Sequence, residues 1–159
     1  MKKWLLLLAT VALGTGAFAS EDWSTDFVKA SAKAKAEGKY LLIDFSGSDW
    51  CGWCVKLDKE VFSKNTFKKY AKDNLVLVMA DFPRDKSKQS AGLQKQNQAL
   101  AKKFKVRGFP TVFILNPDGK TINKTGYQAG GPEAYVEYIK KAIAADKAKV
   151  AKAKKAATK

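Results

Sequence analysis

The chain has 159 residues, a formal net charge of +15 and 46% hydrophobic residues. This hydrophobic content excludes a wholly disordered chain, and the length suits one domain with a substantial core. The absence of histidine excludes Ser-His-Asp and Cys-His catalysis and histidine-liganded metal sites. Two cysteines are too few for a disulfide scaffold or a four-ligand metal site, so we expect no metal.

Lysine supplies almost all of the positive charge, since only Arg84 and Arg107 are arginines. Proteins that read nucleic acids favour arginine for bidentate base contacts and for stacking. We therefore expect no nucleic-acid partner. We interpret the basicity as solubility and attraction to acidic partners or surfaces.

The first nineteen residues have the parts of a secretory signal peptide in the right order. The basic residues 2–3 precede the apolar run 4–12 and Ala17-Phe18-Ala19, a small-x-small cleavage signal. A retained membrane anchor is the alternative, but the apolar run is shorter than the ~20 residues that span a bilayer. We expect a periplasmic or secreted protein, with no stable membrane insertion after cleavage. Its parts are a signal peptide at 1–19, a domain at 20–145 and a Lys/Ala-rich tail at 146–159.

The first half of the expected domain alternates helical and strand patterns. In chain order these predict a helix at 22–38, a buried strand at 40–45, a loop at 46–49, and helical segments at 51–62 and 66–72. Ser24 or Thr25 can cap the first helix, and Gly38 can end it.

The second half begins with another buried strand and ends with a helix. In chain order we expect a strand at 75–82, a polar segment at 83–98 leading into a helix, a turn at 106–110, a strand at 111–115, a hairpin turn at 116–119, an edge strand at 120–127 and a helix opening at 130–132. The tail can prolong that helix or fray, because Val150 is its only large apolar residue. The alternation predicts an α/β fold, a central mixed sheet of about four strands with helices on both faces.

Both cysteines lie in the segment Trp50-Cys51-Gly52-Trp53-Cys54, between a predicted buried strand and a predicted helix. Free backbone N–H groups and the dipole at a helix N-terminus stabilise an anion, so the pKa of Cys51 should be lowered. Cys54 lies one turn further along and can close a disulfide with Cys51. Gly52 lets the backbone of a partner approach the sulfur atoms.

Three segments together resemble thioredoxin: Ile43-Asp44-Phe45, the cysteine segment 50–54, and Gly108-Phe109-Pro110-Thr111. The resemblance covers roughly residues 22–145 and implies a thioredoxin-like fold. Within this superfamily, the sequence at 47–54 is similar to secreted bacterial thioredoxin-like proteins. It is also similar to the soluble domain of the membrane disulfide interchange reductases.

The resemblance implies roles for the two cysteines and for one acid. Cys51 would be the nucleophile that attacks a substrate disulfide, and Cys54 would resolve the mixed disulfide. Asp44 would be a buried carboxylate under Cys54 that exchanges its proton through water, with a pKa raised by burial. The alternative for Asp44 is an acid at a strand end that faces solvent.

The resemblance also implies a substrate-binding surface around the cysteines. Pro110 would be cis and face the pair, and the backbone of Phe109 would pair with an extended substrate. Trp50 would shield the sulfur atoms, and Trp53 would contact substrate beside Gly52. An ordinary trans proline and plain loop packing by Trp53 are the alternatives.

Four departures from thioredoxin stand out. Gly-Trp replaces Gly-Pro between the cysteines, and the loop from Asp44 to Cys51 is one residue longer. The strand at 75–80 lacks the lysine that accompanies the buried acid. The first strand of the fold is short or absent.

We therefore expect an exported thiol–disulfide oxidoreductase without a bound cofactor, more reductase or isomerase than oxidase. Its partners would be protein thiols and disulfides and a membrane-bound electron donor, and it would be a monomer. The alternative is a binding module without redox turnover, which presents the Phe109-Pro110 groove or the basic tail. A purely structural disulfide is disfavoured, because closing so short a loop removes little chain entropy.

Overall fold

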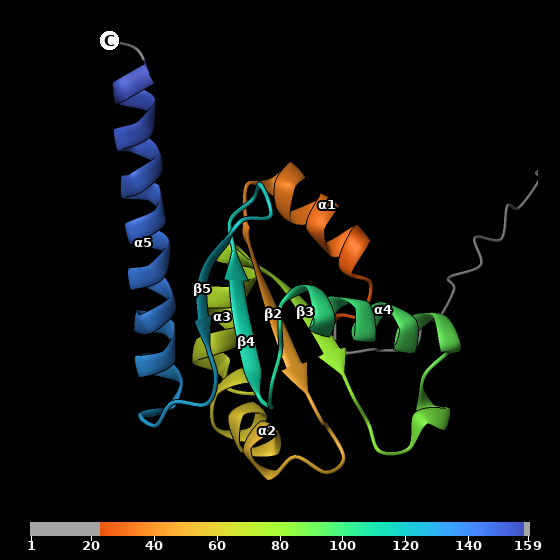
Figure 1. The fold of residues 1–159 in the computed structure, drawn as a ribbon. Coiled ribbons are helices and arrows are strands. Elements are labelled where there is room, and N and C mark those ends of the chain that lie inside the picture. The colour runs from red at the N-terminus through yellow and green to blue at the C-terminus, as the bar shows by residue number, and fades with distance from the viewer. Residues whose placement is uncertain (1–22, 158–159) are drawn as a thin grey trace, which may run out of the picture.

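The computed structural model describes residues 23–157, so the predicted signal peptide lies outside the described residues. A sheet in the order β1-β3-β2-β4-β5 forms the centre of the molecule (Figure 1). The strands are β1 (Trp23–Ser24), β2 (Tyr40–Ser46), β3 (Leu75–Asp81), β4 (Thr111–Leu115) and β5 (Thr121–Thr125). β1 and β2 run parallel to β3, whereas β4 is antiparallel to both β2 and β5.

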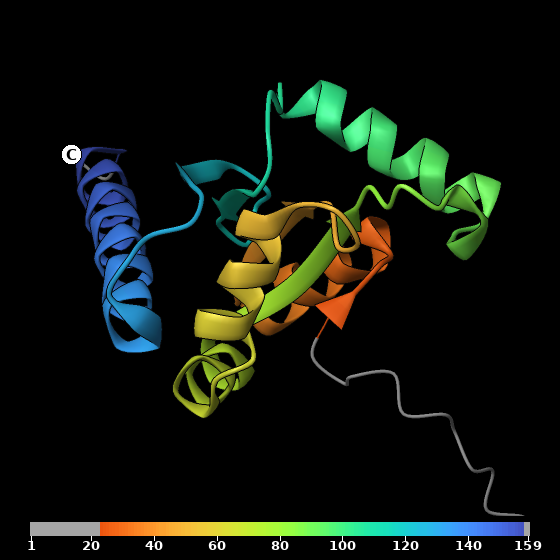
Figure 2. The same cartoon turned by 90° about the horizontal axis from the view of Figure 1, so that it is seen from below.

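Helices cover both faces of the sheet. They are α1 (Phe27–Glu37), α2 (Gly52–Leu57), the π-helical turn η1 (Asp58–Phe62), α3 (Asn65–Asn74), the 3-10 turn η2 (Lys86–Lys88), α4 (Ala91–Lys103) and α5 (Gly131–Ala157). One core cluster lies between the sheet and α2, η1, α3 and α5, and the other lies beneath α1 and α4. Figure 2 shows α4 well apart from α2 and α3. All seven residues of β2 are buried, because this central strand has a core on each face.

The sheet has five strands rather than the expected four or so, and the predicted helix at 22–38 was too long. The carboxylate of Asp26 accepts a hydrogen bond from the backbone N–H of Lys29 at 3.0 Å, so α1 begins only at Phe27. Trp23 and Ser24 are then free to extend and pair with Leu77 and Val78. The residues assigned to the first turn of the helix therefore form the short first strand.

Most other boundaries lie close to the predicted ones. β4 has the predicted bounds, and β5 is the predicted edge strand but is shorter. The helical segment that follows the cysteines changes to a π-helical turn at Asp58. Gly38 ends α1 with a φ of 64°, a conformation that glycine adopts without strain.

The last helix continues across residue 146 to Ala157, so the tail prolongs it over that range. Four apolar residues of this helix are buried: Tyr135, Val136, Ile139 and Ile143. Within residues 23–157, no helix combines the length and the apolar character needed to cross a bilayer.

Candidate active site

The cysteine pair follows the end of the central strand β2 and opens the helix α2. Backbone N–H groups of Trp50 and Cys51 donate to the carbonyl of Gly47, at 3.2 and 2.8 Å, which turns the chain into the helix. Cys51 caps α2, and its Sγ accepts a hydrogen bond from the backbone N–H of Cys54 at 3.2 Å. The two cysteines form a disulfide, with their Cα atoms 5.2 Å apart. The predicted pairing is therefore present in the structure.

Both cysteines have little access to solvent. Cys51 is 7% exposed and Cys54 is 3% exposed. Both cysteines are therefore buried in the disulfide form, and only a small part of either residue meets solvent. A partner must approach along the surface formed by the neighbouring side chains.

The carboxylates of Asp81 and Asp49 accept hydrogen bonds that fix the loop before the cysteines. The backbone N–H and hydroxyl of Ser48 donate to Asp81 at 2.9 and 2.7 Å. The backbone N–H groups of Arg84 and Asp85 donate to Asp49 at 2.8 and 3.3 Å. The hydrogen bond from Arg84 is the main reason that the pKa of Asp49 is lowered. These bonds fasten the longer loop to the segment that follows β3.

Trp50 connects three loops around the disulfide. Its indole N–H donates to the carbonyl of Phe82 at 2.8 Å, and its ring meets Phe109 edge-on with a centroid distance of 5.7 Å. Phe109 in turn contacts Phe82 at 5.1 Å. A Cβ at Gly47 would lie 2.5 Å from the Trp50 ring, so only glycine fits beneath the indole. Trp50 remains 43% exposed and is part of the surface beside Cys51.

The loop at 108–111 lies against this surface. The peptide bond between Phe109 and Pro110 is cis, the isomer that the thioredoxin resemblance implies. Thr111 donates its hydroxyl to the carbonyl of Gly108 at 2.7 Å, within the same turn. A Cβ at Gly126 would lie 2.9 Å from the carbonyl oxygen of Pro110, so the segment after β5 passes very close. Through the contact of Phe109 with Trp50, the structure brings together two segments that are about 55 residues apart.

Asp44 is buried in β2, between Met79 of β3 and Val112 of β4. Its Oδ1 has no hydrogen-bond partner among the described residues. Burial raises the pKa of Asp44 to about 8, and the nearby carboxylates Asp58 and Asp81 add to this rise. Asp44 is thus a buried acid, as predicted, and does not face solvent. Met79 stands across from it, where the resemblance would place a lysine on the neighbouring strand.

Trp53 is 57% exposed and belongs to a cluster that the sequence analysis did not predict. Its ring lies 5.1 Å from that of Tyr127, and the Lys56 ammonium lies 5.0 Å from both ring centroids. The hydroxyl of Tyr127 donates to Glu60 at 2.6 Å. The spacing of residues 53, 56 and 60 in the sequence is typical of side chains on one side of a helix, so this part of the cluster could have been predicted. Tyr127, however, comes from a distant loop.

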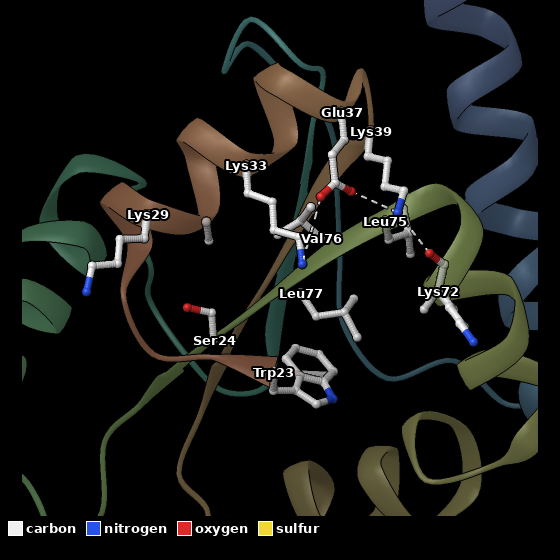
Figure 3. Close-up of a pocket in the computed structure, with 12 residues that line it drawn as sticks. Trp23, Ser24, Lys29, Lys33, Glu37, Lys39, Lys72, Leu75, Val76 and Leu77 are labelled. Atoms are coloured by element: carbon white, nitrogen blue, oxygen red, sulfur yellow. Dashed lines mark hydrogen bonds and ion pairs between the residues drawn. The ribbon is translucent and has the colours of Figure 1, made fainter. Parts of the chain in front are cut away.

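A cavity of about 730 Å³ lies at the end of the sheet where β3 begins (Figure 3). It is lined by Trp23, by Lys29 and Lys33 of α1, by Lys72 of α3, and by the start of β3. The cysteines follow the other end of the sheet, since β2 and β3 run parallel. This cavity is therefore separate from the candidate active site. No cluster of three or more candidate metal-ligating side chains occurs within residues 23–157.

Comparison with known proteins agrees with the fold and the cysteine motif. A family model for the thioredoxin-like domain matches residues 27–143. The disulfide bond reductase DsbH of Chlamydia pneumoniae is 34% identical over 127 residues, covering 80% of this chain and 75% of that protein. A solved structure of a DsbH oxidoreductase has a TM-score of 0.72 at 30% identity, covering 88% of this chain and 94% of the other.

A further relative is much larger than this chain. The thiol:disulfide interchange protein DsbD of Vibrio cholerae is 31% identical over 112 residues. The match covers 68% of this chain but only 17% of DsbD. The similarity therefore concerns one domain of that protein.

Proposed function

This chain belongs to the thioredoxin-like family, and we propose that it is an exported reductase or isomerase of protein disulfides. It is a thiol–disulfide oxidoreductase, since the family match, the relatives and the Cys51–Cys54 disulfide agree. The single observation that carries the proposal is this disulfide at the start of α2, beside the loop with the cis proline.

We assign the nucleophilic role to Cys51 and the resolving role to Cys54. In the reduced protein, the Cys51 thiolate attacks a substrate disulfide, forms a mixed disulfide and releases one substrate thiolate. Cys54, as a thiolate, then attacks Cys51 and releases the second substrate thiolate. Two electrons pass to the substrate, and the Cys51–Cys54 disulfide remains. The position of Cys51 at the N-cap of α2 and the N–H of Cys54 directed at its sulfur support this order.

Asp44 is proposed as the proton carrier for Cys54. A pKa of about 8 leaves a fraction of this carboxyl ionised near neutral pH, and a base with a pKa near the working pH transfers protons well. Asp44 would accept the proton of Cys54 through water as the mixed disulfide resolves. It would return the proton when the disulfide is reduced again.

The substrate-binding surface is proposed to consist of Trp50, Gly52, Trp53, Phe109 and Pro110. Both indoles are substantially exposed, and the space where a side chain at position 52 would begin is open. An extended substrate segment would pair with the backbone of Phe109 and place its disulfide at Cys51. No bound cofactor is needed for this exchange.

The direction of exchange and the compartment are further parts of the proposal. The segment at 1–19 supports export to the periplasm or beyond, where protein disulfides form. The name of the DsbH relative supports the reductive direction, and the similarity to DsbD supports a membrane-bound electron donor. We propose that the chain acts as a monomer on protein thiols and disulfides, without a nucleic-acid partner.

Trapping of substrates tests the assignment of the two cysteines. Cys54→Ser should accumulate mixed disulfides on Cys51 when reduced protein meets an extract of exported proteins, because the resolving thiol is missing. Cys51→Ser should trap far fewer under the same conditions. Non-reducing gels followed by mass spectrometry measure both.

Two further measurements decide between the proposal and a binding module. A reduction potential below that of glutathione would support the reductive direction. A wild-type protein that leaves insulin disulfides intact, with slow alkylation of Cys51 at neutral pH and intact partner capture, would instead support a binding module.

A further inference from the structure

The last helix extends beyond the domain that it helps to build. Ile143 is its last buried residue, and Asp146 connects it to the sheet by accepting a hydrogen bond from the hydroxyl of Tyr40 at 2.9 Å. Every residue from 147 to 157 is exposed. Figure 1 shows this part of α5 projecting beyond the sheet, at the end of the molecule opposite to α2.

This projecting segment, residues 147–157, is strongly cationic. It contains five lysines and no acidic residue: Lys147, Lys149, Lys152, Lys154 and Lys155. At 100° per residue, the five lysines span about 220° of the helix circumference and leave a sector of about 140° without lysine, which holds Val150, Ala153 and Ala157. Val150 is the only large apolar side chain of the segment and is exposed. The segment therefore carries charge over more than half of its circumference, and its uncharged sector has a single large apolar side chain.

The charge pattern changes where the helix leaves the domain. Nearer its start, Lys140 pairs with Glu137 at 2.7 Å, and on α1 Lys33 pairs with Glu37 at 4.0 Å. In the projecting segment, Lys152 has a lysine three positions away on each side, and such like-charge neighbours disfavour a helix. A helix selected for solubility alone would gain from interspersed acids. Residues 147–157 themselves contain no acid that offsets this charge.

We propose that residues 147–157 form a cationic arm that binds anionic phospholipid surfaces. Lysines spread over more than half of the helix circumference suit the diffuse field of lipid headgroups, where each adds to binding without a fixed geometry. A protein interface would need an apolar core, and the arm offers only Val150. The arm contains no arginine, the residue favoured for base readout and bidentate phosphate contacts.

The placement of the arm has a consequence for the enzyme. Because the arm projects from the end opposite to α2, a protein held by it keeps Cys51 on the side away from the lipid. The arm would concentrate the enzyme at a membrane surface and leave the disulfide open to soluble partners. This inference does not depend on the catalytic roles proposed above.

Vesicle binding tests the arm with matched variants. All proteins begin at Ser20, because the apolar residues 4–12 would bind lipid by themselves, and every described element lies within residues 23–157. The arm variant replaces its five lysines by glutamine. The control variant has the same net charge as the arm variant. It replaces by glutamine five exposed lysines outside the arm: Lys35, Lys68, Lys69, Lys95 and Lys120. Circular dichroism checks that all three proteins are folded.

The readout is co-sedimentation with phosphatidylcholine vesicles, with and without an equal share of phosphatidylglycerol, at low and high salt. We expect the wild-type and control proteins to bind the anionic vesicles at low salt and to be released by salt. The arm variant should bind at least about tenfold more weakly. Equal losses in both variants, or wild-type binding to neutral vesicles, would overturn the proposal. Tighter binding to duplex DNA or to polyglutamate than to the vesicles would assign the arm to another partner and would also overturn it.

Discussion

At the scale of single residues, the most unusual feature is a carboxyl group buried without a hydrogen-bond partner for one oxygen. Asp44 lies in the central strand among apolar neighbours, and its Oδ1 has no partner among the described residues. An ionised carboxylate in such a place is costly, so the protein retains the proton up to a pKa of about 8. This buried acid, which we propose as the proton carrier for Cys54, therefore reduces the stability of the fold at neutral and basic pH.

This cost predicts a pH-dependent effect of Asp44→Asn. Between the unfolded pKa near 3.8 and the folded pKa near 8, the unfolded chain releases a proton that the folded chain retains. The stability of the wild type should therefore decline across this range relative to the variant, and the difference should level off above pH 8. We expect a gain on the order of 4 kcal/mol for the variant at pH 7 and little difference at pH 4.

Urea unfolding of the oxidised proteins between pH 4 and pH 9 measures this effect. Asp73→Asn is a matched control, because Asp73 is exposed on α3. A difference between wild type and the Asp44 variant that does not vary with pH would contradict the assignment of a raised pKa.

At the scale of elements, the loop between β2 and α2 decides where the disulfide lies. Asp49 and Asp81 hold this loop against the segment after β3, and Trp50 covers Gly47 while contacting Phe109. This loop is one residue longer than in thioredoxin, and side-chain hydrogen bonds hold it in place. The position of the cysteine segment depends on residues from three separate loops.

Gly47→Ala should disturb this arrangement. The new Cβ would lie 2.5 Å from the Trp50 ring, so either the indole or the loop must move. We expect a loss of about 1–3 kcal/mol in the free energy of unfolding, as for other overpacked sites, and altered tryptophan fluorescence. Gly92→Ala in α4 is the control, since its new Cβ would lie 4.0 Å from the hydroxyl oxygen of Ser90 and alanine favours a helix. Equal stability of both variants would contradict the close packing of Trp50 on Gly47.

At the scale of the whole molecule, the domain and the projecting end of α5 are energetically separate. The core of α5 ends at Ile143, whereas residues 147–157 are exposed throughout. Side chains that stay in solvent contribute little burial to folding. The arm should therefore contribute little to the free energy of unfolding of the domain.

Removal of residues 147–159 should leave the domain intact. We expect the free energy of unfolding to change by less than about 0.5 kcal/mol, as for exposed substitutions. Ile139→Ala, by contrast, removes a fully buried side chain from the same helix and should cost about 2–5 kcal/mol. Thermal and urea unfolding measure both. A large loss on truncation would mean that the arm packs on the domain.

The order of the elements from α1 onward, the bounds of β4 and the edge position of β5 were readable from the sequence. Periodicity, turn residues and the cysteine motif act over a few positions, so a single sequence reveals them. The joint motif around Asp44, Cys51 and Pro110 was also sufficient to identify the family.

Other features depend on segments far apart in the chain. The strand β1 requires Leu77 and Val78 as partners, and Tyr127 reaches Glu60 across 67 positions. The raised pKa of Asp44 depends on the burial that several elements create together. Such contacts leave no periodic trace in the sequence, because they arise only when packing closes the core. The sequence alone therefore determined the elements and the reactive motif, and only the tertiary structure decided the surroundings of the reactive groups.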